Sequence, residues 1–216
     1  MINIVVTALK GGAGVSAVVS GFAQAAAQQD LGVVCIDADT HGSLKYHLGL
    51  VGLATGEKSE STASRIKLGT PQTAYDFSGD LLLWDLPRSS GDVQAEALAR
   101  ASAVVLVVPA SATSVTMAAS VKRFLSEGEN RYLLINFDDS RIPLKRAAAD
   151  HLTRHFRDRV IGRIRQDETV EEAVANLEML STSAPYSAAW GDMRTALTNL
   201  LQRMEEVPLA AAGSRR

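Results

Sequence analysis

The chain has 216 residues, of which 46% are hydrophobic and 21% are charged, with a net charge of −2. This composition is ordinary for a globular protein and excludes a wholly disordered chain. The single cysteine, Cys35, excludes an intramolecular disulfide and a cysteine-based zinc site, and its apolar neighbours predict a core position. No apolar run approaches the roughly 18–20 residues that cross a bilayer, and the first residues lack a signal-peptide pattern. We therefore expect a soluble, cytoplasmic protein without a transmembrane segment.

Short apolar runs alternate with helical patterns along the whole chain. The runs of strand length are residues 2–7, 33–36, 81–84, 104–108, 132–135 and 160–164. The segments with helical patterns are residues 16–29, 114–127, 143–156, 170–178 and 188–206. This alternation predicts a doubly wound α/β fold with a mostly parallel sheet. We expect one domain over residues 1–207, a flexible tail over 208–216, and a polar surface loop at 55–64.

A glycine-rich turn joins the first strand to the first helix. It reads Lys10-Gly11-Gly12-Ala13-Gly14-Val15-Ser16-Ala17. Glycines let backbone N–H groups point into such a loop, and the helix N-terminus adds partial positive charge for an anion. Ser16 is placed to offer its hydroxyl to Mg²⁺. The turn is therefore predicted to bind phosphate.

Polar residues also follow other predicted strands, namely Asp37, Asp39, Asp85 and Asn136. In open α/β sheets this edge is where ligands bind, so the four side chains are expected to gather near the phosphate loop. Turn formation is the alternative role for Asp37 and Asp39, and strand capping is the alternative for Asn136. Asp85 follows four apolar residues, where a charge calls for a partner cation.

The loop resembles the deviant Walker A motif of ParA/MinD-type P-loop ATPases. Lys10 matches the signature lysine, which in that family reaches the nucleotide of a dimer partner, and the glycines match as well. Val15 stands where the family has its second lysine, and Ala17 replaces a hydroxyl. BcsQ-type proteins of bacterial cellulose secretion are similar and also depart at this lysine.

The resemblance continues in chain order to about residue 200 and implies ATP or ADP with Mg²⁺ as ligands. It implies catalytic roles for Lys10 and Asp39, metal roles for Ser16, Asp37 and Asp85, and an adenine contact for Asn136. The loop residues that it implies for nucleotide binding are Lys10, Gly11, Gly12, Ala13, Gly14, Val15, Ser16 and Ala17. Because valine has no charge for the β- and γ-phosphates, we expect ATP hydrolysis to be weak or absent.

Residues 141–165 are strongly basic and carry a net charge of +6, which leaves −8 for the rest of the chain. Five of these cations are predicted to contact nonspecific DNA through its phosphates. They are Arg141, Lys145, Arg146, Arg154 and Arg157. A solvated helix face is the alternative. His151 and His155 have the four-residue spacing of a helical metal pair, but a solvated basic face accounts for them too.

The resemblance supports three functional hypotheses. The first is a ParA-like homodimer that positions cargo or partitions DNA, with an adaptor protein as partner. The second is a BcsQ-like regulator of a cellulose or exopolysaccharide secretion complex. The third is a pseudo-ATPase adaptor that keeps the fold alone. DNA binding at low salt separates the first hypothesis from the others.

Overall fold

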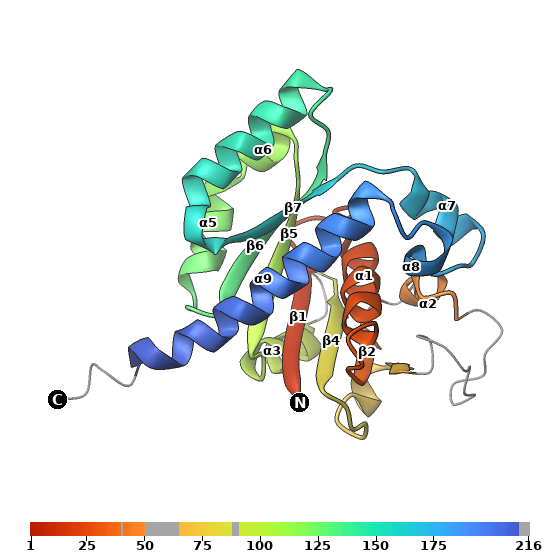
Figure 1. Cartoon of the computed structure of the whole chain (residues 1–216). Helices are drawn as coiled ribbons and strands as arrows, with labels where there is room; N and C mark the ends of the chain where they lie inside the picture. The colour runs from red at the N-terminus through yellow and green to blue at the C-terminus, as the bar shows by residue number, and fades with distance from the viewer. Residues whose placement is uncertain (40, 51–64, 88–90, 212–216) are drawn as a thin grey trace.

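The computed structural model describes residues 1–39, 41–50, 65–87 and 91–211. In this part of the chain, seven strands form one sheet in the order β3-β2-β4-β1-β5-β6-β7, and all paired strands are parallel (Figure 1). The strands are β1 (Ile2–Ala8), β2 (Val33–Asp37), β3 (Ile66–Gly69), β4 (Leu81–Leu86), β5 (Ala103–Pro109), β6 (Arg131–Asp138) and β7 (Val160–Arg165). The predicted doubly wound fold is confirmed, and its described strands are parallel throughout.

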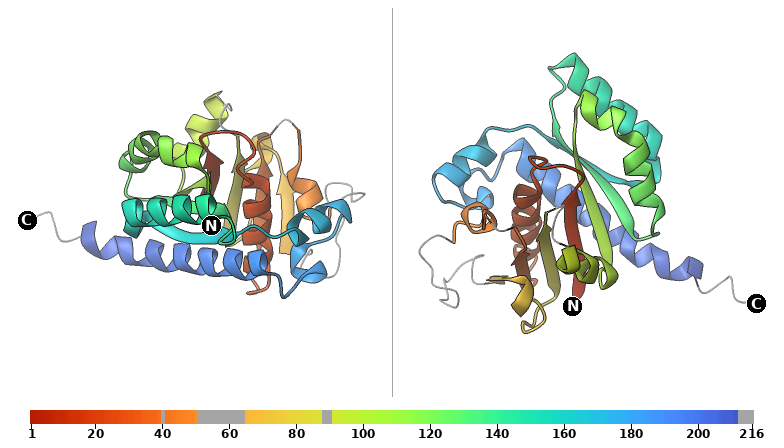
Figure 2. Two further views of the ribbon diagram at one scale, coloured as in Figure 1. Left: turned by 90° about the horizontal axis from the view of Figure 1, so that it is seen from above. Right: turned by 180° about the vertical axis from the view of Figure 1, so that it is seen from behind.

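Helices cover both faces of the sheet (Figure 2). On one face lie α1 (Val15–Ala27), α2 (Leu44–His47), α7 (Thr169–Ala175), α8 (Leu180–Ser183) and α9 (Ala188–Ala211). On the other face lie α3 (Gly91–Ala99), α4 (Ala112–Thr116), α5 (Ala118–Ser126) and α6 (Pro143–Phe156). Because each face is covered, the central strands are apolar on both sides, which explains their unbroken hydrophobic runs.

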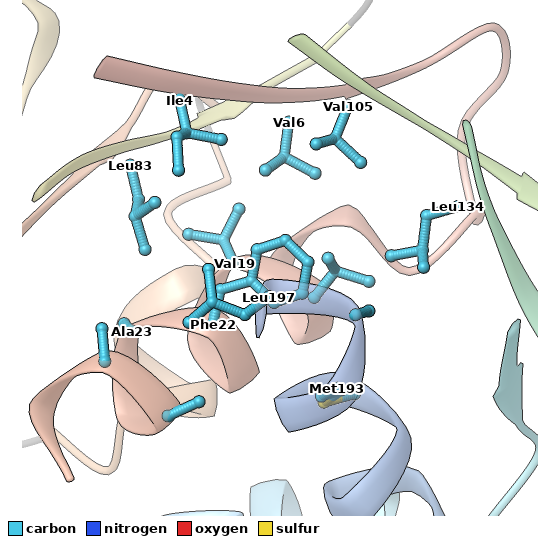
Figure 3. Packing of buried hydrophobic residues seen from close by; sticks show 14 of the residues in the cluster. Ile4, Val6, Val19, Phe22, Ala23, Leu83, Val105, Leu134, Met193 and Leu197 are labelled. Carbon is cyan, nitrogen blue, oxygen red and sulfur yellow. The ribbon is translucent and has the colours of Figure 1, made fainter. Parts of the chain in front are cut away.

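The largest apolar cluster lies between the sheet and the α1–α9 pair (Figure 3). Phe22 of α1 and Leu197 of α9 are fully buried there against Val6 of β1. Cys35 is fully buried in the same cluster, as predicted. This packing fixes the start of α1 directly beyond the end of β1, so the glycine-rich turn is held between two rigid elements.

Several element boundaries differ from the predictions. The single helix expected over 114–127 is two helices, because Met117 leaves helical geometry between α4 and α5. The helix expected over 170–178 ends at Ala175, because Leu177 has a left-handed φ of 58° and donates its N–H back to the Val174 carbonyl. Strand β3 and helix α3 were not predicted.

The C-terminal helix also differs from the prediction. Helix α9 continues to Ala211, past the expected end at Glu206, and residues 212–216 of the expected tail lie outside the described residues. The expected loop at 55–64 lies outside them as well. Within the part of the chain that the structure describes, no helix is both long and apolar enough to span a membrane.

Candidate nucleotide site

The glycine-rich turn forms a cradle at the start of α1. Gly12 and Gly14 have φ angles of 73° and 85°, which L side chains rarely adopt, and Gly14 is the N-cap of α1. A Cβ on Gly14 would lie only 2.4 Å from Nδ2 of Asn136. The third glycine of the motif is therefore required by its conformation and by its contact with β6.

The turn lines a pocket of about 430 Å³ at the C-terminal edge of the sheet. This volume lies within the range of small-molecule sites. The pocket brings together most of the predicted site residues, which are the loop residues Lys10 to Ala17 together with Asp39, Asp85 and Asn136. Asp37 does not line it.

Val15 is half-buried in the first turn of α1 and packs against the main apolar cluster. It also lines the pocket, so a side chain at this position has access to both environments. Lys10 lies exposed at the start of the turn and forms no ion pair among the described residues. The cradle therefore keeps its backbone geometry and one exposed cation, but has no cation at the first turn of the helix.

Asp85 is a buried carboxyl at the end of β4, with only 3% of its surface exposed. Ser16 hydrogen-bonds to it, while its Oδ2 atom has no partner among the described residues. The pKa of Asp85 is raised to about 7, mainly by burial. The hydrogen bond from Ser16 lowers this pKa, and the nearby carboxylates of Asp37 and Asp39 raise it. An unpaired oxygen of this kind is where a cation would be expected.

The other two aspartates have different surroundings. Asp37 lies beside Asp85 in the sheet, and its two oxygens accept the backbone N–H groups of Asp39 (3.0 Å) and Leu44 (3.1 Å). Burial raises the pKa of Asp37 in spite of these donors. Asp39 instead accepts both the backbone N–H and the ring Nδ1 of His41, and these bonds lower its pKa. Asp37 therefore braces the β2–α2 loop, and Asp39 is the carboxylate that reaches the pocket.

Asn136 ties the end of β6 to the cradle. Its Nδ2 donates to the carbonyl of Ala13 (2.8 Å), and its Oδ1 accepts the backbone N–H of Phe137 (2.9 Å). The side chain is buried, with 3% of its surface exposed. The strand-capping role is thus observed, while the adenine contact implied by the resemblance stays a prediction.

Residues 4–180 match the family model described as the CobQ/CobB/MinD/ParA nucleotide binding domain. The chain belongs to this family. Among solved structures, the MinD cell division protein of Aquifex aeolicus matches with a TM-score of 0.76 at 19% identity, over 94% of this chain and 97% of that chain. A search of curated protein sequences finds no match.

Two further structures show the same fold. A putative plasmid partition protein from Borrelia burgdorferi B31, bound to AMPPNP, matches with a TM-score of 0.70 at 16% identity, over 94% of this chain and 100% of that chain. The MinD protein of Pyrococcus horikoshii OT3, complexed with Mg-ADP, matches with a TM-score of 0.70 at 15% identity, over 96% and 98%.

The residues of this MinD/ParA-type pocket fit a magnesium ion. Asp85 offers its unpaired buried oxygen, and the Ser16 hydroxyl lies beside it, 2.9 Å from the Ser43 hydroxyl. No group of three or more His, Cys, Asp or Glu side chains within the described ranges forms a complete metal site. Mg²⁺ usually takes one or two protein ligands and completes its shell with phosphate oxygens and water.

The pocket of this family member also has a wall that was not predicted from the sequence. Phe137 and Gln166 line it, together with His47 from α2. Burial lowers the pKa of His47, because it disfavours the charged imidazolium. Only the position of Phe137 directly after Asn136, at the end of an apolar strand, offered a signal in the sequence.

The basic segment lies mostly outside the pocket, on and around α6. Arg141 pairs with Asp139 (2.9 Å), and Lys145 donates to the side chain of Gln166. Arg157 is the C-cap of α6 and begins a short 3₁₀ helix (Arg157–Arg159), and its side chain donates to the Arg154 carbonyl. Among the predicted DNA contacts, Arg146 and Arg154 are exposed and have no ion pair within the described residues.

Proposed function

We propose that the chain is a nucleotide-dependent, dimerising protein of the ParA/MinD type, which positions cargo or partitions DNA and hydrolyses ATP weakly or not at all. The observation that carries this proposal is the intact cradle with Lys10 exposed on it and Val15 in the first turn of α1. The backbone donors and the helix N-terminus remain available for phosphate, while the charge needed for phosphoryl transfer is missing.

ATP or ADP with Mg²⁺ is the proposed ligand. Support comes from the AMPPNP and Mg-ADP complexes of the two similar structures and from the unpaired oxygen of Asp85. Lys10 and the helix N-terminus would meet the phosphates, and Asp85 with Ser16 would hold the metal. Bound Mg²⁺ would supply positive charge on the phosphate oxygens in addition to Lys10, the cation of the described loop.

Dimerisation is expected to depend on Lys10. With Mg-ATP, the wild type should sediment as a dimer and Lys10→Ala as a monomer, because an exposed lysine on the loop can reach the phosphates of a second copy. Lys45→Ala, which removes an exposed lysine on nearby α2, is the matched control and should still dimerise. Mg-ATP-dependent dimers of Lys10→Ala would contradict the role of this lysine.

The outer face of α6 is the proposed DNA surface. Arg146 lies four positions before Asp150 and Arg154 four positions after it, so the three lie along one side of the helix. Asp150 forms its ion pair with Arg163 from β7 (2.7 Å), while Arg146 and Arg154 act on it only through longer-range attraction. A row of such cations fits the phosphates of a duplex without reading its sequence.

Binding to random duplex DNA is therefore expected to weaken steeply with salt. Each phosphate contact contributes about −0.9 to the log–log salt slope, so Arg146→Gln with Arg154→Gln should flatten the slope by about two units. The control pair is Lys67→Gln on edge strand β3 and Arg194→Gln on the opposite face, both exposed. Equal slopes for both pairs would remove α6 from the DNA surface, and no binding at low salt would favour the secretion-accessory hypothesis.

A further inference from the structure

Strand β6 carries an irregularity beside the pocket. Its pairing register with β7 shifts between Ile135 and Asp138, and the residue within that shift, Phe137, has a φ of 57°. A bulge that needs a positive φ is usually built with glycine, because a bulky side chain is strained there. Bulges beside functional sites redirect a side chain, so a phenylalanine at this point calls for a role for its ring.

The surrounding structure holds this bend from both sides. Before it, Asn136 accepts the Phe137 N–H and donates to the Ala13 carbonyl in the cradle. After it, the Asp138 carboxylate accepts from Arg163 (2.8 Å), and the Asp138 carbonyl accepts the N–H of Gln166 (2.8 Å). The conformation of Phe137 is therefore imposed by neighbours that also shape the pocket.

The Phe137 ring is not used for packing the core. It is half-buried and belongs to none of the three apolar clusters formed by the described residues. Its Cζ atom lies 3.1 Å from the position a Cβ would take on Gly14, so the ring sits against the cradle and lines the pocket. Ile164, Val170 and Met193 line the pocket as well.

The pocket thus has two chemically distinct kinds of lining. Lys10, Ser16 and Asp85 carry the groups that suit phosphate and a metal ion. Phe137 and the partly buried Val170 offer apolar surface on the other side. The amides of Asn136 and Gln166 and the charged side chains of Arg165, Asp167, Glu168 and Glu171 line the pocket there as well. The flat ring of Phe137, with polar groups around it, suits a planar heteroaromatic ring.

We propose that Phe137 is the stacking platform for the base of the bound nucleotide, and that the bend in β6 places its ring there. This inference rests on the proposed nucleotide binding. Because every base has a π-face, the platform acts on adenine and guanine nucleotides alike, while the phosphates are held by the cradle. Phe137 therefore raises the affinity of the pocket for nucleotides relative to polyphosphate without a base.

The test compares Phe137→Leu, which keeps an apolar side chain on the same strained backbone, with the wild type. Affinities are measured for Mg-ATP, Mg-GTP and Mg-tripolyphosphate. Phe137→Leu should weaken both nucleotides by about tenfold and leave tripolyphosphate unchanged. The control is Phe124→Leu, which removes a ring of α5 that stacks with Arg131 of β6. It should alter none of the three affinities.

A second variant gives a direct signal. In Phe137→Trp, fluorescence from the new indole should be quenched by Mg-ATP but not by Mg-tripolyphosphate, measured against the wild type with its buried Trp84 and Trp190. If Phe137→Leu weakens all three ligands equally, the ring supports the cradle and the proposal is wrong. The proposal is also wrong if Phe137→Leu binds both nucleotides as tightly as the wild type does. If the wild type binds neither nucleotide nor tripolyphosphate, both the proposed nucleotide-dependent function and the stacking role of Phe137 are wrong.

Discussion

Replacing Val15 by lysine is expected to raise ATP turnover by about 10²–10³-fold. A fixed charge aimed at the transferring phosphoryl group stabilises its transition state by several kcal/mol. Val15 is half-buried at the pocket wall, so a longer side chain can leave the apolar cluster and reach the ligand without displacing the core. Steady-state turnover with Mg-ATP, together with nucleotide affinity, measures the effect.

Val15→Met is the matched control, because methionine has comparable reach and no charge. It should hydrolyse ATP as slowly as the wild type. If methionine and lysine accelerate turnover equally, side-chain length rather than charge limits the reaction. If the wild type already turns over rapidly and lysine adds nothing, the absence of this lysine does not govern the chemistry of the pocket.

Asp85 is expected to make the ligand-free protein less stable as the pH rises from about 4 to about 7. Its carboxyl titrates near 3.8 when unfolded and at about 7 when folded, because burial disfavours the charged form. Between these values the folded protein binds more protons, so its free energy of unfolding falls with rising pH. The contribution of the protonated Asp85 carboxyl to the free energy of unfolding is complete below about pH 4. Its loss between about pH 4 and pH 7 amounts to about 4 kcal/mol.

The measurement is the urea midpoint at pH 5 and pH 8 in EDTA. Asp85→Asn should lose less stability than the wild type between these two values and be the more stable protein at pH 8. Asp76→Asn removes an exposed carboxyl and should follow the wild type. Parallel pH profiles for Asp85→Asn and the wild type would mean that the buried carboxyl does not set this dependence.

The sequence predicts the central strands well because they are buried on both faces. Val33–Ile36 and Leu81–Trp84 are unbroken apolar runs, a pattern typical of parallel strands that are buried on both faces. The edge strand β3 reads Ile66-Lys67-Leu68-Gly69, and this mixed pattern is too short to distinguish from a loop. It becomes a strand only because β2 offers a parallel partner, which is a tertiary effect.

The candidate site was predictable where residue type alone dictates the geometry. The glycine spacing and the strand-end positions of Asp85 and Asn136 placed these residues in one pocket. Two features needed the structure. Asp37 is directed at backbone N–H groups of its own loop, and Phe137 reaches the pocket through a left-handed backbone conformation. The spacing of residues along the sequence predicts neither the direction of the Asp37 side chain nor the bulge at Phe137.

The two outermost strands of the sheet bear on how copies of this protein can meet. An open sheet edge presents unpaired backbone groups that can recruit a strand from another molecule and start aggregation. Here one edge is the short β3, which carries Lys67, and the other is β7, which carries Arg163 and Arg165. A foreign strand at either edge would lie beside these charged side chains, of which Arg163 and Arg165 are held in ion pairs with Asp138, Asp150 and Asp192. Among the described strands, continuation of the sheet from one molecule to the next is therefore disfavoured at both edges.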